Sequence, residues 1–348
     1  MKRLLAIILV IVIALSCLVL SACNAPEEKP TEAPTATPTE KPTEEPTQKP
    51  TEESTQKPTE EPTEEAEVDF EDMLIEMIEA YGGKKLSVFG DSISTYGGIS
   101  NNIEYNTTIG DNAVYYNGSN CGLTSSKNTY WGLFCERAGT SLCVDNAWSG
   151  DSLRSGRFLT RAKNLHRDTG DNAVNPDLIL VYFGINDLWS GGTSVAQPNG
   201  NLNELMKSKG DQTEEEVFDE WFADVLARYE GGTFNVSSAN WDELYALLIH
   251  LITTTYPDAK VVCVGLTVNT NNNYKDCTEL VPKHNESMTY ITKQMGTLYV
   301  DQYSAINESN LKSYMGDGAG SYLHPNNAGH KVLFEEIVKV LYKDIKSQ

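Results

Sequence analysis

Positive charge is scarce in this 348-residue sequence. Lysine and arginine together number 27 and aspartate and glutamate 49, which gives a formal net charge of −22 at pH 7. Polyanions repel a protein this acidic, so the composition argues against nucleic acids and anionic surfaces as partners. The chain also lacks an amphipathic basic helix of the kind that binds lipid interfaces.

The cysteines lack the regular spacing of a metal or redox motif. Cys17 and Cys23 lie near the N-terminus, and five more follow: Cys121, Cys135, Cys143, Cys263 and Cys277. One or two disulfides among these five would suit a protein outside the cell. Free buried thiols are equally compatible with the sequence, because several of the five lie in apolar stretches.

The first 22 residues have the composition of a secretory signal. Lys2 and Arg3 precede an apolar run at residues 4–20, and the sequence Leu-Ser-Ala-Cys ends at Cys23. This ending resembles the bacterial lipobox, so we expect cleavage after residue 22 and lipidation of Cys23. The alternative is a transmembrane helix, since the run approaches the roughly 20 residues that span a bilayer. The lipobox predicts a protein anchored by lipid at the extracellular face of the bacterial cell membrane.

Residues 23–66 lack the large apolar side chains that a folded core needs. Proline, threonine and glutamate dominate the segment, and an eight-residue repeat begins at Lys41, Lys49 and Lys57. Such a segment has nothing to bury, and its prolines favour an extended chain at about 3.1 Å per residue. We therefore expect a disordered stalk and, at residues 67–348, one globular α/β domain.

Expected strands and helices alternate along residues 67–348. Apolar periodicity and glycine stops predict helices at 68–80, 130–138, 153–165, 214–229, 241–254, 282–295 and 328–345. Apolar runs predict strands at 85–89, 141–146, 178–183, 260–266 and 297–300. This alternation predicts a parallel sheet with helices on both faces, whose ligands bind at the carboxyl ends of the strands.

Four polar motifs lie at the ends of predicted strands or before the last helix. They are Gly90-Asp91-Ser92, Asn146-Ala147-Trp148-Ser149-Gly150, Gly184-Ile185-Asn186-Asp187 and His324-Pro325-Asn326. Each alone is also typical of an ordinary turn. Together and in this order they resemble the SGNH/GDSL hydrolase superfamily. The resemblance implies a flavodoxin-like three-layer α/β/α sandwich and ester hydrolysis.

The resemblance also assigns roles to individual residues. It implies that Ser92 is the nucleophile and His324 the general base, because a serine hydroxyl reacts poorly until a base takes its proton. The implied oxyanion hole consists of the Ser92 N–H, the Gly150 N–H and the side-chain amide of Asn186. This chemistry requires no metal and no organic cofactor.

The sequence departs from the family pattern just before the histidine. The family commonly has an aspartate three residues earlier, but that position is Ser321 here, and the nearest upstream acid is Asp317. Asp317 can orient the imidazole of His324 if residues 319–322 bulge outward. Alternatively, Ser321 or a backbone carbonyl holds the imidazole, which would leave a Ser-His dyad.

The context favours an acylated carbohydrate as substrate. A stalked domain faces external polymers, and extracellular members of the superfamily often deacetylate polysaccharides. The segment 188–258 is longer than a simple crossover between two parallel strands needs, and we expect it to form one wall of the cleft. The alternatives are a lipid-directed acyl hydrolase or thioesterase, and a non-catalytic glycan-binding module. Aromatic side chains that could stack on sugars are Tyr115, Tyr116, Trp131, Trp148 and Trp189, although core packing also suits most of them.

Overall fold

The computed structural model describes residues 68–99, 114–168, 173–189, 200–267, 277–317 and 321–348. All of them belong to one unit of the chain, Glu65–Gln348. The predicted signal segment, Cys23 and the predicted stalk therefore lie outside the described residues. Within these ranges no helix is long and apolar enough to cross a bilayer.

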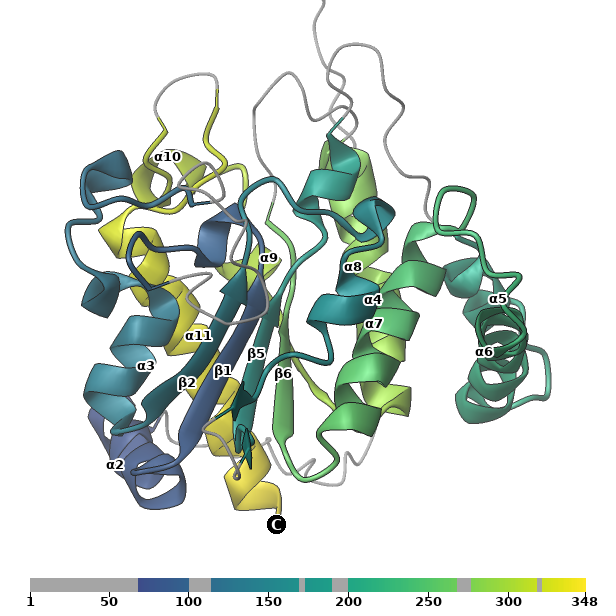
Figure 1. Cartoon of the computed structure of the whole chain (residues 1–348), viewed down its shortest axis with the longest axis horizontal. Coiled ribbons are helices and arrows are strands. Elements are labelled where there is room, and N and C mark those ends of the chain that lie inside the picture. Colours follow the sequence, from purple (N-terminus) through teal and green to yellow (C-terminus); the bar gives the residue numbers. More distant parts are fainter. Residues whose placement is uncertain (1–67, 100–113, 169–172, 190–199, 268–276, 318–320) are drawn as a thin grey trace, which may run out of the picture. The chain divides into compact units, whose positions relative to one another are not determined.

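Five parallel strands form the central sheet (Figure 1). They are β1 (Lys85–Gly90), β2 (Ser141–Ala147), β5 (Leu178–Tyr182), β6 (Lys260–Val264) and β7 (Leu298–Val300). Their spatial order is β2-β1-β5-β6-β7, and each neighbouring pair is parallel. Every residue of β5 is buried, as expected for a strand that is covered on both faces. The five predicted strands are thus confirmed.

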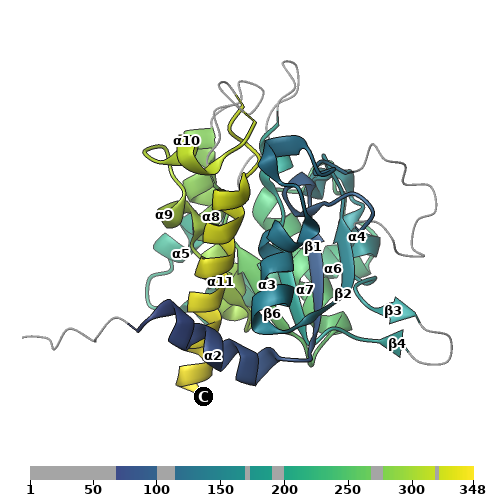
Figure 2. The ribbon, with the colours of Figure 1, turned by 90° about the vertical axis from the view of Figure 1, so that its left-hand side faces the viewer.

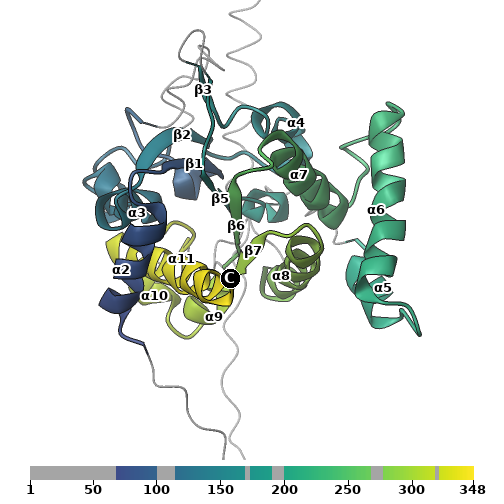
Figure 3. The ribbon, with the colours of Figure 1, turned by 90° about the horizontal axis from the view of Figure 1, so that it is seen from below.

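Helices cover both faces of this sheet. Viewed from below, α2, α3 and α11 lie on one face and α4, α7 and α8 on the other (Figure 3). Figure 2 shows α3 and α11 side by side, with α2 across their lower ends. The helices are α2 (Phe70–Tyr81), α3 (Tyr130–Ala138), α4 (Phe158–Arg161), α5 (Leu202–Lys207), α6 (Glu214–Glu230), α7 (Trp241–Thr255), α8 (Cys277–Gln294), α9 (Gln302–Ala305), α10 (Leu311–Tyr314) and α11 (Asn327–Ser347). This arrangement confirms the predicted three-layer α/β/α sandwich.

Local sequence signals explain where several helices begin and end. Capping boxes start α6 and α7 at Thr213 and Asn240. In each box the N-cap side chain accepts from the backbone N–H of a glutamate three residues later, and the N-cap backbone N–H donates to that glutamate's side chain. Helix α3 ends at Gly139, whose φ of 72° suits glycine. These helices lie within a residue or two of the predicted ranges.

The predicted helix at residues 153–165 is wrong. The structure has two short helices there, η5 (Leu153–Ser155) and α4 (Phe158–Arg161). Between them Gly156 adopts a left-handed conformation with φ of 70°, which ends the first helix. The side chain of Arg161 then turns into the protein interior, where it forms an ion pair with Asp151. This tertiary contact overrides the helical periodicity of the segment.

Helix α8 begins at Cys277, five residues before its predicted start at Pro282. Proline favours the first turn of a helix, which is why the sequence suggests a start there. The preceding turn forms nevertheless, because Cys277 and Val281 are buried in the core. The sequence also missed α5 and a two-stranded antiparallel pair, β3 (Arg167–Asp168) and β4 (Ala173–Val174).

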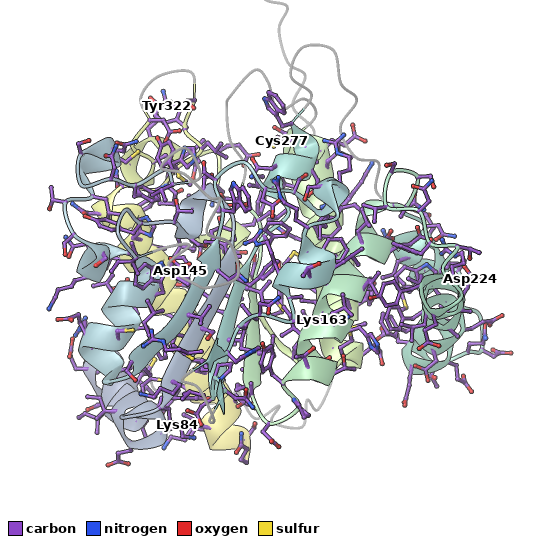
Figure 4. All side chains as sticks on the ribbon, viewed as in Figure 1. Lys84, Asp145, Lys163, Asp224, Cys277 and Tyr322 are labelled. Carbon is purple, nitrogen blue, oxygen red and sulfur yellow. The ribbon has the colours of Figure 1, made fainter. Side chains whose placement is uncertain are left out.

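The four polar motifs lie toward one end of the sheet. Three of them lie at the carboxyl ends of β1, β2 and β5, which are neighbours in the order β2-β1-β5. The fourth precedes α11. Figure 4 labels Tyr322, two residues before His324, at this end of the domain, whereas Lys84 lies at the opposite end. Parallel topology therefore gathers motifs that are far apart in sequence.

Candidate active site

Ser92 lies just after the carboxyl end of β1. It opens a short 3-10 helix, η1 (Ser92–Ser94), whose N-cap is Asp91. The Asp91 carboxylate accepts a hydrogen bond from Ile93 N at 3.1 Å, which fixes the turn. A side chain at position 90 would lie 2.2 Å from Ser94 Oγ, so the turn needs Gly90. The sharp turn places Ser92 at the edge of the sheet.

Ser92, His324 and Asp317 form a continuous chain of hydrogen bonds. The Ser92 Oγ lies 2.8 Å from His324 Nε2, and His324 Nδ1 lies 2.7 Å from Asp317 Oδ2. A carboxylate only accepts, so Nδ1 carries the proton and the Nε2 lone pair faces the serine hydroxyl. The backbone N–H of His324 also donates to Asp317 Oδ1 at 2.8 Å. In this arrangement His324 Nε2 can take the proton of the Ser92 hydroxyl.

Asp317, and not Ser321, is the group on Nδ1 of the imidazole. The Ser321 hydroxyl instead donates to Asp317 Oδ2 at 3.1 Å. Burial would raise the pKa of Asp317, but the hydrogen bonds and charge of His324 hold that pKa below its usual range. Between these two residues, Tyr322 has a φ of 35°, which is unusual for a residue with a side chain. The geometry therefore favours Asp317 over the dyad reading.

Three hydrogen-bond donors of the predicted oxyanion hole come from the ends of neighbouring strands. Gly150 follows β2 and has a φ of 73°, and Asn186 lies in η6 (Ile185–Leu188), just after β5. Asn186 Nδ2 donates to the Asp151 carbonyl at 2.9 Å, which links the two segments. Among the described residues, the N–H groups of Ser92 and Gly150 have no hydrogen-bond partner. Both are therefore available to a substrate oxygen.

A buried ion pair between Arg161 and Asp151 adjoins these donors, because Asp151 directly follows Gly150 and its carbonyl accepts the hydrogen bond from Asn186 Nδ2. The Arg161 guanidinium also donates to the Gly90 carbonyl at 3.0 Å and to Asn146 Oδ1 at 3.1 Å. It lies over the Phe89 ring, 4.7 Å from the centroid. Breaking such a pair typically costs about 3–5 kcal/mol because it leaves an uncompensated buried charge. No local sequence pattern indicates this ion pair, which links the ends of β1 and β2 to the Gly150 loop.

A second buried carboxylate holds the loop beside Asn186. Asp187 accepts hydrogen bonds from Leu153 N and Arg154 N, both at 2.9 Å. Burial raises the pKa of Asp187 to about 7, although these two N–H groups favour its charged form. Asp187 thus connects η5 to the turn that carries Asn186.

The aromatic residues predicted to stack on sugars differ in how deeply they are buried. Trp131 and Tyr116 are buried, and Trp131 Nε1 donates to the Ser94 carbonyl at 2.8 Å, so both belong to the core. Trp148 is half-buried, with the guanidinium of Arg157 4.5 Å above its ring. Trp189 is 48% exposed, three residues after Asn186.

Tyr115 was predicted to stack on a sugar, but in the structure its ring stacks on the His324 imidazole. Its ring is parallel to the His324 imidazole, at a centroid distance of 3.4 Å. The sequence did not reveal this contact, because the two residues are far apart in the chain.

Free thiols are the alternative that the structure supports for the cysteines. The five described cysteines are Cys121, Cys135, Cys143, Cys263 and Cys277, and all of them are free. The described residues also contain no group of three or more histidine, cysteine, aspartate or glutamate side chains that could hold a metal ion.

Comparisons with known proteins give one family. A family model described as GDSL-like lipase/acylhydrolase matches residues 88–332. A search of curated proteins found no match. Among solved structures, a putative GDSL-like lipase from Bacteroides ovatus is 21% identical, with a TM-score of 0.47 over 75% of this chain and 99% of its own. An acetylxylan esterase from Geobacillus stearothermophilus is 17% identical, with a TM-score of 0.42 over 75% of this chain and 95% of its own.

Proposed function

This chain belongs to the GDSL-like lipase/acylhydrolase family and is an ester-bond hydrolase, and from this premise we propose that it deacylates carbohydrates with Ser92 as nucleophile. The observation that carries the proposal is the hydrogen-bonded chain from Ser92 Oγ through His324 to Asp317. Unpaired N–H donors lie at the ends of the adjacent strands, where an ester carbonyl would bind.

The proposed reaction has two steps. In the first, Ser92 Oγ attacks the ester carbonyl carbon while His324 Nε2 takes the hydroxyl proton. The oxyanion accepts hydrogen bonds from Ser92 N, Gly150 N and Asn186 Nδ2, and its collapse expels the alcohol, which takes the proton from the imidazolium. In the second step, a water molecule attacks the acyl carbon and gives a proton to His324 Nε2. Collapse of this second intermediate breaks the bond between Ser92 Oγ and the acyl carbon, which releases the acid, and the imidazolium returns its proton to Ser92 Oγ.

Asp317 supports both steps because it remains a carboxylate. The lowered pKa of Asp317 keeps it anionic at neutral pH. The anion holds Nδ1 protonated and stabilises the imidazolium that forms whenever Nε2 takes a proton. Asp317 therefore acts on the reaction through His324.

A neutral acylated glycan suits the surroundings of this site. The exposed ring of Trp189 follows the Asn186 turn and offers an apolar face of the kind on which sugars stack. The net charge of −22 disfavours anionic lipid surfaces. We further propose that a lipid on Cys23 anchors the protein at the outer face of the cell membrane, which would hold the domain near external polysaccharides.

The test compares ester substrates on the purified full-length protein. Acetyl, butyryl and palmitoyl nitrophenyl esters and acetylated xylan would be assayed, and a fluorophosphonate probe would label the nucleophile. Ser92→Ala should lose both turnover and labelling, whereas Ser237→Ala, an exposed loop serine, should retain both. Labelling that persists in Ser92→Ala would remove Ser92 from its role. A preference for the palmitoyl ester would indicate a lipid-directed acyl hydrolase instead.

A further inference from the structure

The ring of Tyr115 lies flat against the imidazole of His324. The two rings are stacked with 3.4 Å between their centroids and an interplanar angle of 10°. Tyr115 is also linked to the serine turn, because its backbone N–H donates to Thr95 Oγ1 at 2.8 Å, and that hydroxyl donates to the Ser92 carbonyl at 2.9 Å. One residue therefore contacts the imidazole and is fixed to the segment that carries the serine.

The hydroxyl of Tyr115 leads through Cys121 to Asp317. The Tyr115 Oη lies 3.4 Å from Cys121 Sγ, and Sγ lies 3.6 Å from Asp317 Oδ1. Because the carboxylate only accepts, the thiol donates to Asp317 and the tyrosine hydroxyl donates to sulfur. Burial and the charge of Asp317 raise the pKa of the Cys121 thiol to about 11, so the thiol keeps its proton at neutral pH.

The backbone of Cys121 adopts a conformation that is rare for a residue with a side chain. Its φ is 54°, in the left-handed region. Neighbours hold it there: a Cβ at Gly316 would lie 2.3 Å from Cys121 Cβ, and Asn327 Nδ2 donates to the Gly122 carbonyl at 2.7 Å. Strained residues that their surroundings hold in place concentrate at functional sites.

We propose that Tyr115 and Cys121 are positioning residues that hold the His324–Asp317 pair in its reactive geometry and set the pH at which the imidazole becomes a base. The inference rests on the proposed function, in which His324 takes the Ser92 proton. The aromatic face of Tyr115 stabilises the imidazolium. The thiol of Cys121 stabilises the carboxylate of Asp317 and so weakens its attraction for the imidazolium. Tyr115 and Cys121 therefore shift the titration midpoint of the His324 imidazole in opposite directions: Tyr115 raises it and Cys121 lowers it.

An NMR titration of the His324 imidazole tests this directly, and it does not depend on turnover. Tyr115→Leu should lower the titration midpoint by about half a pH unit to one unit, the range that a cation–π contact allows. Cys121→Ala should raise it. The assignment is tractable, because burial lowers the pKa of both His284 and His330 to about 3 and keeps them neutral throughout. Three of the five histidines remain, His166, His250 and His324, and the signal that disappears in His324→Asn belongs to His324.

Matched variants separate positioning from loss of packing. Cys121→Ser keeps a donor and should retain the parent midpoint. Cys135→Ala removes another half-buried thiol, on α3, and should change nothing. In the ester assay, kcat of Tyr115→Leu should fall with little change in KM, and the acid limb of kcat/KM should move as the NMR midpoint does.

Parent midpoints in both Tyr115→Leu and Cys121→Ala, or shifts in the same direction, would overturn the inference. A parent protein without ester turnover would instead remove the proposed function. The NMR titration would still decide whether the two side chains control the imidazole, so the two failures are distinguishable.

Discussion

Asp317→Asn replaces a carboxylate that accepts hydrogen bonds from both Nδ1 and the backbone N–H of His324. An asparagine has one accepting oxygen and one donating NH₂ group in its place. If the oxygen stays on the backbone N–H, the NH₂ group faces Nδ1. The imidazole must then carry its proton on Nε2, 2.8 Å from Ser92 Oγ. In that tautomer it has no lone pair with which to take the serine proton.

The expected loss is on the order of 10²-fold or more in kcat, which corresponds to at least about 2.7 kcal/mol of transition-state stabilisation. The assay is hydrolysis of a nitrophenyl acetate by the purified protein, with KM measured in parallel. KM should change less than kcat, since the carboxylate stabilises the imidazolium, which forms only during reaction.

Ser321→Ala is the matched control for this prediction. Its hydroxyl donates to Asp317 Oδ2, but the two hydrogen bonds from His324 remain when it is removed. Near-parent activity is therefore expected in Ser321→Ala. Near-full activity in Asp317→Asn, or a larger loss in Ser321→Ala, would refute the reasoning and support a Ser-His dyad.

Three further predictions concern the oxyanion hole, a buried carboxyl group and the N-terminus. Asn186→Ala should reduce kcat by about 10²-fold or more with a smaller effect on KM, because its amide binds mainly the transition state; a change in KM alone would limit Asn186 to substrate binding. Burial raises the pKa of Asp91 to about 7 in the folded protein, against about 3.9 in the unfolded chain. Between pH 4 and 7 the unfolded state therefore binds fewer protons at this group, and the contribution of Asp91 to stability falls as pH rises. Asp91→Asn should flatten this dependence in urea unfolding, by up to about 1.4 kcal/mol per pH unit, and an unchanged slope would contradict the shift. Cys23→Ser should abolish lipidation and release the protein from the membrane fraction; a mature N-terminus elsewhere, found by mass spectrometry, would contradict the lipobox.

Elements with strong local signals could be predicted from the sequence. The strand β5 has an uninterrupted apolar run because both of its faces are covered. Helix α3 matches its predicted range because Gly139 stops it, and α7 differs by one residue at its C-terminal end. The clustering of the motifs was also predictable, because parallel strands bring their carboxyl ends to one edge.

Contacts between distant residues could not be predicted in this way. Arg161 lies in an amphipathic segment typical of a surface helix, yet its side chain is buried in an ion pair with Asp151. Cys121 and Asp317 meet although 196 positions separate them in the chain. Neither contact leaves a periodic or local pattern, because each depends on which loops the completed sheet brings together.

The position of Asp317 explains why residue spacing is a weak guide to this third group. The family spacing is three residues, whereas Asp317 precedes His324 by seven. The two ends of the intervening loop are nevertheless paired, by an antiparallel bridge between Met315 and Pro325 and a 2.8 Å hydrogen bond from Gly316 N to the His324 carbonyl.

This pairing fixes the backbone on either side of the loop, so the number of residues between Asp317 and His324 can vary without moving the carboxylate away from the imidazole. The requirement for this carboxylate is therefore a distance to Nδ1, and a sequence can meet it with different spacings as long as the base of the loop stays paired. A shortened loop that keeps Met315, Gly316 and Asp317 should accordingly retain the contact between Asp317 and His324.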